Sequence, residues 1–474
     1  WSPYDKLNDG DTRHWTNDEK PLEGLLRVDG KTYRFMGSKD KYLLESIVPM
    51  ADEVRWKAQY TRKNPGAGWE KPDFNASGWK EGEAAFGSPD LSFVSTRWSE
   101  ENSDLYVRRS FDLTEEDLKN DLYLVYSHDD VFELFINGTS VVKTGETWRE
   151  GIKLHLTDDM KKLLKPGKNV IASHCHNTTG GAYTDFGLYK NLARSNEQIM
   201  QAEQKSVSVL ATSSYYTFVC GPVELDVVFT APMLINDYDL LSMPINYISY
   251  QVRSTDKKTH DVQFYLSANP LQGVNKSSQP TVSSTVIKNG VKYLKTGTID
   301  QPILAKKGDG ICIDWGYFYM PNVNGNVSLA AENTVKDAFL STGELPVGEN
   351  EIVCRKASQM PTLAYVHNFG NVTTASSFTM LGYDEVQDIE YMYERYKGYW
   401  AHGGKVTIFD AFDRMKNTFS DLMAKCREFD KMIYDDGLKA GDVKYAEILS
   451  GSYRHVIAAH KLFQDKDGNL LFFS

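Results

Sequence analysis

The chain has 474 residues, of which 41% are hydrophobic and 25% charged, and its formal net charge is −11. That length is too great for a single hydrophobic core, so we expect roughly two to four domains. The acidic balance argues against nucleic acid and anionic membrane surfaces as partners. No window approaches about 18 consecutive apolar residues, so the sequence predicts no transmembrane helix.

Aromatic residues make up 12% of the chain. This content is typical of large β-proteins, in which rings pack across strands, and of proteins that stack rings on sugars. The five cysteines lie far apart and form no CxxC motif, which argues against a zinc ribbon and a dense disulfide framework. We predict neither a bound metal nor a cofactor.

The first half of the chain carries short strand-like segments with strong turn signals. Asp29-Gly30 separates two apolar runs within residues 22–36 and predicts a β-hairpin. Residues 122–138 end on Asn137-Gly138, the dipeptide that most strongly favours a two-residue hairpin turn. Because such strands recur about every 8–12 residues, residues 54–190 are predicted to form a sandwich or jelly roll.

The second half changes from strands to helices. Strand patterns over residues 205–390 predict a second, larger β-domain. From Thr407 apolar residues recur at spacings of three and four, which predicts one helix to Ile433 and another over about 442–463. A single helical hairpin must pack on the β-domain or on further helices. The apolar run at 470–473 would lack a partner at a terminus, so we expect more chain to follow.

Polar residues between the strands of the predicted jelly roll are candidates for ligand binding. His128, Asp129 and Asp130 form a polar group between two strands, while His174 and His176 share one face of a strand, because strand side chains alternate. The His-x-His spacing suits a metal, but no third ligand is fixed by spacing. These residues either contact a ligand or tie loops together through hydrogen bonds.

Asp384 and Glu385 are the candidates for catalysis. Carboxylates beside aromatic residues suit a polar-substrate site that needs acid–base work; the rings that follow are Tyr391, Tyr393, Tyr396, Tyr399 and Trp400. The alternative is a turn followed by the acids of a helix start. The chain has no GxSxG, HExxH or phosphate-loop motif.

Two resemblances to known families can be stated. Residues from about 54 to 190 resemble the galactose-binding-type jelly roll of family-2 glycoside hydrolases, and the matching segments are 69–79, 86–87, 106–111, 129–138, Trp148 and 166–170. The whole chain resembles the N-terminal part of the glutaminase A-like proteins of gut Bacteroidetes. That similarity is carried by residues 25–37, 216–226, 244–248, 314–317, 381–385 and 453–460.

The second resemblance implies an architecture in which a β-sandwich precedes a toroid of six α-hairpins. The predicted fold class is mainly β, with two β-sandwich or jelly-roll domains followed by an α-helical hairpin that resembles the start of an (α/α)6 toroid. The jelly roll would be inserted into a sandwich assembled from both flanks. The predicted bounds are 1–53 for the first sandwich strands, 54–190 for the jelly roll, 191–400 for the rest of the sandwich and 401–474 for the hairpin.

The same resemblance implies hydrolysis of L-glutamine to L-glutamate and ammonia by the intact protein. This portion is expected to be inactive alone, because most of the toroid would lie outside it, and Asp384 and Glu385 would lie near the toroid mouth. The alternatives are a glycoside hydrolase of toroid architecture and a non-catalytic carbohydrate-binding or scaffold module. Expected partners are a small-molecule or carbohydrate ligand and the remaining C-terminal toroid segment, in a periplasmic or secreted protein whose signal peptide has been removed.

Overall fold

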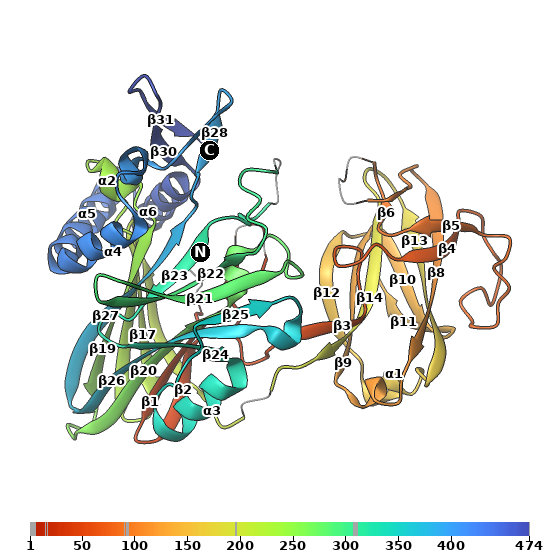
Figure 1. The fold of residues 1–474 in the computed structure, drawn as a ribbon, viewed down its shortest axis with the longest axis horizontal. Helices are drawn as coiled ribbons and strands as arrows, with labels where there is room; N and C mark the ends of the chain where they lie inside the picture. Colours follow the sequence, from red (N-terminus) through yellow and green to blue (C-terminus); the bar gives the residue numbers. More distant parts are fainter. Residues whose placement is uncertain are drawn as a thin grey trace. The chain divides into compact units, whose positions relative to one another are not determined.

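The computed structural model describes residues 6–14, 16, 18–89, 91, 94–194, 197–306 and 311–473. The chain divides into two compact units, a larger one of Trp1–Lys41 with Arg194–Ser474 and a smaller one of Tyr42–Ala193. Strands make up most of both units, and the long helices gather near the C-terminus (Figure 1). The predicted fold class, mainly β with a C-terminal helical segment, is confirmed.

Two sheets form the smaller unit, with strand orders β11-β10-β13-β8-β4-β5 and β12-β9-β14-β6-β7, and β3 pairs with β14. Buried residues of both sheets form one core, which includes Val107, Leu124 and Phe186. The elements are β3 (Leu44–Val48), β4 (Lys57–Thr61), β5 (Lys80–Glu83), β6 (Phe86–Gly87), β7 (Thr96–Arg97), β8 (Ser103–Leu113), β9 (Leu122–Asp129), β10 (Val131–Ile136), β11 (Thr139–Lys143), β12 (Arg149–His155), α1 (Asp158–Lys161), β13 (Gly167–Asn177) and β14 (Tyr183–Asn191).

Local turn chemistry forms the β10–β11 hairpin of this unit. Asn137 and Gly138 both adopt positive φ, 47° and 93°, as a two-residue hairpin turn requires. The unit begins at Tyr42 and not at residue 54, because β3 pairs with β14 and so belongs to this unit rather than to the larger one.

The larger unit is built on two sheets, with strand orders β15-β2-β1-β20-β26-β24 and β16-β17-β18-β19-β27-β23-β22-β21-β25. Residues of both sheets share one core that includes Phe35, Phe218 and Phe264. The strands are β1 (Leu22–Val28), β2 (Lys31–Met36), β15 (Met200–Gln201), β16 (Glu203–Val209), β17 (Ser213–Cys220), β18 (Val223–Thr230), β19 (Ile245–Ser254), β20 (His260–Ala268), β21 (Thr281–Lys288), β22 (Val291–Thr298), β23 (Tyr317–Pro321), β24 (Asn326–Ala331), β25 (Glu351–Cys354), β26 (Pro361–Val372) and β27 (Thr374–Asp384).

The predicted hairpin over residues 22–36 is present as β1 and β2. Its turn residues Asp29 and Gly30 have positive φ, 48° and 82°. β1 pairs antiparallel with β20 along its whole length, from Leu22 opposite Ala268 to Val28 opposite Val262. The N-terminal strands are therefore part of a sheet whose other members come from beyond residue 194.

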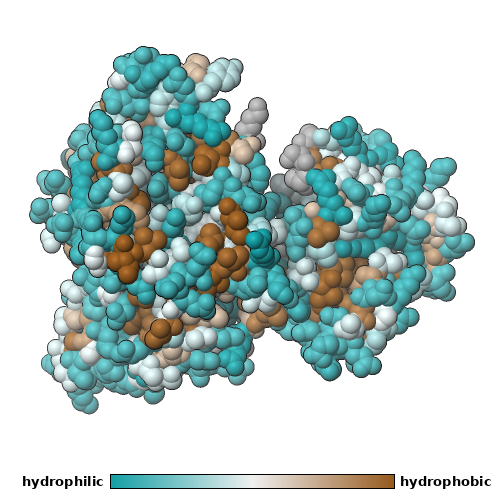
Figure 2. Space-filling model, in the orientation of Figure 1, coloured by the Kyte–Doolittle hydropathy of each residue, from teal (hydrophilic) through white to brown (hydrophobic). Residues whose placement is uncertain are grey.

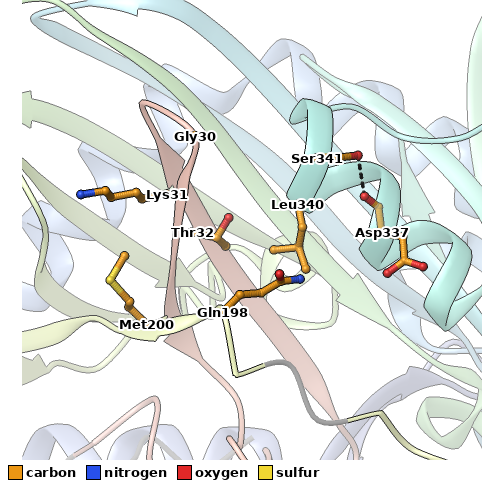
Figure 3. A pocket seen from close by; sticks show the side chains of 8 residues that line it. All are labelled: Gly30, Lys31, Thr32, Gln198, Met200, Asp337, Leu340 and Ser341. Carbon is orange, nitrogen blue, oxygen red and sulfur yellow. Dashed lines mark hydrogen bonds between the residues drawn. The ribbon is translucent and has the colours of Figure 1, made fainter.

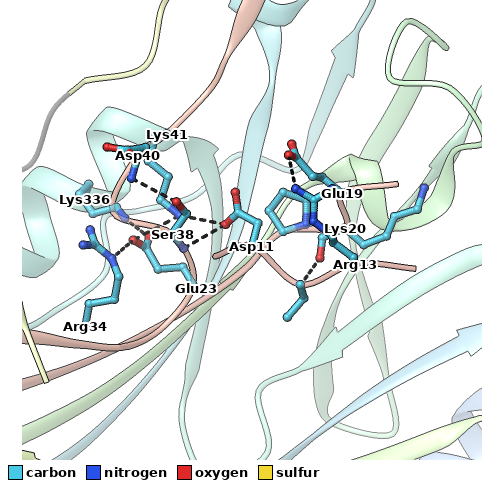
Figure 4. A network of polar contacts seen from close by, with 12 residues as sticks. Asp11, Arg13, Glu19, Lys20, Glu23, Arg34, Ser38, Asp40, Lys41 and Lys336 are labelled. Carbon is cyan, nitrogen blue, oxygen red and sulfur yellow. Dashed lines mark hydrogen bonds and ion pairs between the residues drawn. The ribbon is translucent and has the colours of Figure 1, made fainter. Parts of the chain in front are cut away.

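A buried ionic network joins β1 and β2 to the helix α3 (Glu332–Thr342) (Figure 4). The Glu23 carboxylate forms ion pairs with Lys336, with Arg34 at 3.4 Å and with Lys41 at 3.7 Å. Burial alone would raise the pKa of Glu23, but the cations Lys336, Lys41 and Arg34 outweigh it and hold that pKa well below its usual range. Glu23 is the shared anion of the network.

The helical segment packs on the sheet through β19. It contains the short helix α2 (Tyr238–Leu241), α4 (Ile408–Asn417), α5 (Phe419–Ala440) and α6 (Val443–Ala458). A capping box between Thr407 and Asp410 starts α4, and the Tyr247 hydroxyl donates to the Met415 carbonyl at 2.6 Å. The prediction of a single helix from Thr407 to Ile433 is wrong, because the structure has two helices there, α4 and α5, separated at Thr418.

The chain after α6 also differs from the sequence prediction. The second helix ends at Ala458, and residues predicted as its last turn form β30 (Lys461–Gln464). β30 pairs with β31 (Leu470–Phe473), so the terminal apolar run has a partner within the chain.

Among the described residues no helix is long and apolar enough to span a membrane. The face drawn in Figure 2 is mostly hydrophilic, with separate hydrophobic patches.

Replacing the shared anion should destabilise the larger unit. Glu23→Ala leaves buried cations without a counter-charge, so we expect the free energy of unfolding to fall by about 3–5 kcal/mol. Urea unfolding followed by circular dichroism measures the change. Asp436→Ala, which removes an exposed pair with Lys439, is the control and should cost under about 1 kcal/mol. Equal effects of the two variants would show that the network is not a stabilising feature.

Candidate functional site

Three carboxyl groups and one lysine form a cluster at the loop that follows β27 in the larger unit. It consists of Asp384, Glu385, Asp388 and Lys461, and we call it the Glu385 cluster. Glu385 is only 9% exposed, and Lys461 donates a hydrogen bond to its Oε1 in an ion pair. Among the described residues its other oxygen, Oε2, has no hydrogen-bond partner. One acceptor of a buried carboxyl group is thus unused.

The loop that carries Glu385 is held against the segment before β23. Gly316 makes this approach possible, because a Cβ there would collide with the Asp384 carbonyl and lie 2.8 Å from Glu385 Cα. Its φ of 75° also favours glycine. The Tyr383 hydroxyl donates to the Trp315 carbonyl at 2.6 Å, and Trp315 Nε1 donates to the Gln387 carbonyl at 3.0 Å. These bonds fix the loop on both sides of Glu385.

The pKa of Glu385 lies near neutrality. Burial raises it from 4.5 to about 7; Lys461 opposes this rise, and Asp388 and Asp384 add to it. Burial also raises the pKa of Asp388, again against the effect of Lys461. A carboxyl group that changes protonation near pH 7 is suited to accept and return a proton during catalysis.

The two predicted catalytic residues have different roles in this loop. Asp384 Oδ1 accepts a hydrogen bond from the Val386 backbone at 2.9 Å, so its side chain forms a local turn. Glu385 is the buried group that pairs with Lys461. The next long helix, α4, begins only at Ile408, so neither residue belongs to a helix start.

Two small hairpins pack beside the cluster, formed by β28 (Ile389–Tyr391) with β29 (Glu394–Tyr396) and by β30 with β31. Their rings are in contact: Phe463 lies 5.3 Å from Tyr396 and 6.0 Å from Tyr391, between ring centroids. This places Lys461, two residues before Phe463, next to Glu385. Sequence reasoning missed Lys461 and Asp388, because a predicted helix covered 461 and no local pattern links it to residue 385.

The predicted ligand-binding residues of the smaller unit form two adjacent groups, because Val131, which follows Asp130, pairs with His176. The first lies at the β9–β10 turn, where the buried His128 ring stacks on Phe132 and its Nδ1 lies 2.9 Å from the Asp130 carbonyl. Asp130 Oδ2 accepts hydrogen bonds from the backbones of Thr178 at 2.8 Å and Thr179 at 3.3 Å. Burial raises the pKa of Asp129 to about 6, and the neighbouring Asp130 adds to the rise.

The second group contains His174 and His176, which share the face of β13 opposite to that of the core residue Cys175. Both rings contact one oxygen of Asp104, at 2.7 Å and 3.1 Å. The His174 ring also stacks on Tyr106, with centroids 4.4 Å apart. Across the described parts of the chain, no group of three or more His, Cys, Asp or Glu side chains is positioned to hold a metal ion.

Two concave regions of the larger unit lie apart from all these residues. One, of about 300 Å³, lies between the β1–β2 turn and α3, and its lining includes Lys31, Gln198 and Asp337 (Figure 3). Asp337 there pairs with Arg194 at 3.1 Å. The other, of about 640 Å³, lies between β16, β17, α5 and α6. Neither is lined by a residue of the Glu385 cluster.

Comparisons with known proteins match parts of the chain to two family models and to a curated enzyme. Family models described as domains of unknown function match residues 212–436 (DUF5127) and 1–49 (DUF4964). Glutaminase A of Aspergillus oryzae is 24% identical over 296 residues, which cover 59% of this chain and 41% of that protein. The chain therefore spans about two fifths of the length of the curated relative it matches.

Among solved structures, β-glucuronidase from Ruminococcus gnavus matches in its apo form and in complex with D-glucuronic acid. These chains are 10% identical, with TM-scores of 0.24 and 0.25. Both matches cover 62% of this chain and 47% of the other. Similarity at this level carries no argument about function.

The raised pKa of Glu385 predicts a specific pH dependence of stability. A folded pKa above the unfolded value contributes stability that is fully present below about pH 4.5 and is lost as pH rises through about 7. Glu385→Gln removes this titration. Relative to the variant, the wild type should lose about 3 kcal/mol of unfolding free energy between these limits.

Urea unfolding at pH 4 and pH 8 measures this difference. The control Glu390→Gln changes an exposed carboxylate on β28 that pairs with Arg395, and it should keep the wild-type pH dependence. Parallel profiles of the wild type and Glu385→Gln would contradict the raised pKa.

Proposed function

We propose that this chain is the N-terminal portion of a glutaminase-like hydrolase, which converts L-glutamine to L-glutamate and ammonia in the intact protein. The observation that carries the proposal is the Glu385 cluster, a buried carboxyl group with an unused oxygen and a pKa near neutrality. The 24% identity to a glutaminase A over 59% of the chain supports the reaction class.

The chemistry of amide hydrolysis suits these residues. Glu385 as a carboxylate takes a proton from the attacking water, whose oxygen bonds to the amide carbon, and the resulting carboxylic acid returns the proton to the departing nitrogen. The Lys461 ammonium stabilises the negative charge that develops on the carbonyl oxygen. Ammonia leaves and the new side-chain carboxylic acid remains; that acid then gives its proton to ammonia, so the products are glutamate and ammonium and Glu385 ends as the carboxylate it began as.

The helices indicate where the rest of the site would come from. Apolar side chains of α5 and α6 are 39–65% exposed; they are Met432, Leu438, Val443, Ile448 and Val456. Exposed apolar faces of this extent favour contact with another part of a protein. In this proposal they contact further helices of the same protein, arranged as a toroid, which would complete the site beside the Glu385 cluster.

The decisive comparison is ammonia release from L-glutamine by the longer protein and by the 474-residue chain. We expect turnover by the longer protein and none by the 474-residue chain, because in this proposal further helices complete the site. An enzyme-coupled ammonia assay measures both, with a panel of nitrophenyl glycosides in parallel. Glycoside cleavage without ammonia release would favour the glycoside hydrolase instead.

A second function, carbohydrate binding by the smaller unit, is favoured by one exposed ring. Trp148 is 66% exposed. Its neighbour Arg149 lies opposite His128 in the antiparallel register of β12 and β9. In this proposal the exposed indole supplies an apolar platform for a sugar face, and Asp129, which follows His128 on β9, supplies an acceptor for a sugar hydroxyl group. We propose this rim as a carbohydrate-contacting surface.

A glycan panel tests the second function. We expect Trp148→Ala to weaken binding of the glycans that the wild-type chain retains, by about tenfold or more, because the stacking surface is lost. Tyr393→Ala removes an exposed ring from the larger unit and is the matched control. A panel without any bound glycan, or equal binding by Trp148→Ala, would contradict carbohydrate binding at this rim.

A further inference from the structure

The second concave region of the larger unit has the properties of a ligand site. Its volume of about 640 Å³ lies within the range of small-molecule pockets. Its walls are β16 with the turn after it, one residue of β17, a face of α5 and one residue of α6. We call it the Asp430 pocket. It is distinct from the Glu385 cluster, which contributes none of its lining.

A buried carboxyl group with a spare acceptor lines this pocket. Asp430 is 1% exposed, and its Oδ1 accepts hydrogen bonds from the Thr212 backbone at 2.6 Å and the Thr212 hydroxyl at 2.8 Å. Among the described residues Oδ2 has no hydrogen-bond partner. A buried acceptor without a partner is costly, so a ligand that donates to it gains affinity.

Neighbouring groups determine the charge of Asp430. Burial raises its pKa, whereas the hydrogen bonds from Thr212 and from the Ser213 side chain and the positive charge of Arg454 oppose the rise. Arg454 does not line the pocket. It donates hydrogen bonds to Ser214 Oγ at 2.7 Å and to the Leu210 carbonyl at 2.9 Å. The pocket therefore has a rigidly held, ionisable acceptor.

The rest of the lining is mixed in charge, with the cations Arg427 and Lys431 and the acids Asp435 and Glu447. Arg427, Asp430, Lys431 and Tyr434 follow the spacing i, i+3, i+4 and i+7, so they lie on one face of α5. Lys431 pairs with Asp435 within the helix. Arg427 is exposed and is the cation of the lining that no described ion pair engages.

We propose that the Asp430 pocket binds a free α-amino acid in its zwitterionic form. The ammonium group donates to Asp430 Oδ2, and the carboxylate pairs with the Arg427 guanidinium. The phenol of Tyr215, from β17, and that of Tyr434 lie beside the bound side chain. A neutral sugar would match neither charge, whereas a zwitterion matches both. Binding here involves no chemistry and does not require the Glu385 cluster.

Isothermal titration of the 474-residue chain with L-glutamine tests this site. Arg427→Ala should weaken binding by about tenfold or more, and the exposed side chain can be removed without disturbing the fold. Asp430→Asn should do the same, since asparagine keeps an acceptor for Thr212 but loses the charge. Lys425→Ala removes an exposed cation of α5 outside the pocket and should bind as the wild type does.

Two further probes separate this site from its alternatives. N-acetyl-L-glutamine, which lacks the ammonium group, and glucose should not bind. Glu385→Gln should bind L-glutamine normally, which separates failure of this proposal from failure of the glutaminase proposal. Absence of L-glutamine binding at millimolar concentration, equal binding of glucose, or binding lost in Glu385→Gln but kept in Arg427→Ala would overturn the assignment.

Discussion

The larger unit depends on the antiparallel pairing of β1 with β20, which joins the N-terminal strands to a sheet formed more than 200 residues later. Glu23 of β1 also forms an ion pair with Lys336, which joins this strand to α3. The smaller unit lies between the two flanks in sequence, and β3 pairs with β14, which brings its own first and last strands together. An insertion with neighbouring ends leaves the surrounding sheet undisturbed. One family model matches residues 1–49, which include β3 of the smaller unit, and the other matches residues 212–436 beyond it.

The Glu385 cluster depends on the same larger unit but assembles from three distant segments. Gly316 allows the loop after β27 to approach, Trp315 and Tyr383 fix it by hydrogen bonds, and the β30–β31 hairpin supplies Lys461. Burial and the neighbouring carboxylates oppose the charge of Glu385, while one lysine favours it. This balance puts its protonation near neutral pH, where a single group can act as base and then as acid.

Features set by local chemistry could be predicted from the sequence, whereas those set by distant contacts could not. The turns at Asp29-Gly30 and Asn137-Gly138 follow from residues that tolerate positive φ. Asp384 and Glu385 were found as a carboxylate pair, but their different roles follow from Lys461, 76 residues after Glu385. The pairing of β3 with β14, the interruption at Thr418 and the early end of α6 likewise depend on tertiary packing. Alternation along β13 placed His174 and His176 on one face, but it gave no information about Asp104, which both contact.

We propose that Glu385 transfers a proton and that Lys461 limits the rise that burial causes in its pKa. The most direct test is the pH dependence of kcat/KM for ammonia release from L-glutamine by the longer protein. We expect a limb near pH 7 in the profile of the wild type, because Glu385 must be ionised to act as a base. In Lys461→Met this limb should move to higher pH, since the cation that favours the carboxylate is gone. A profile that is the same in both proteins would contradict the claim.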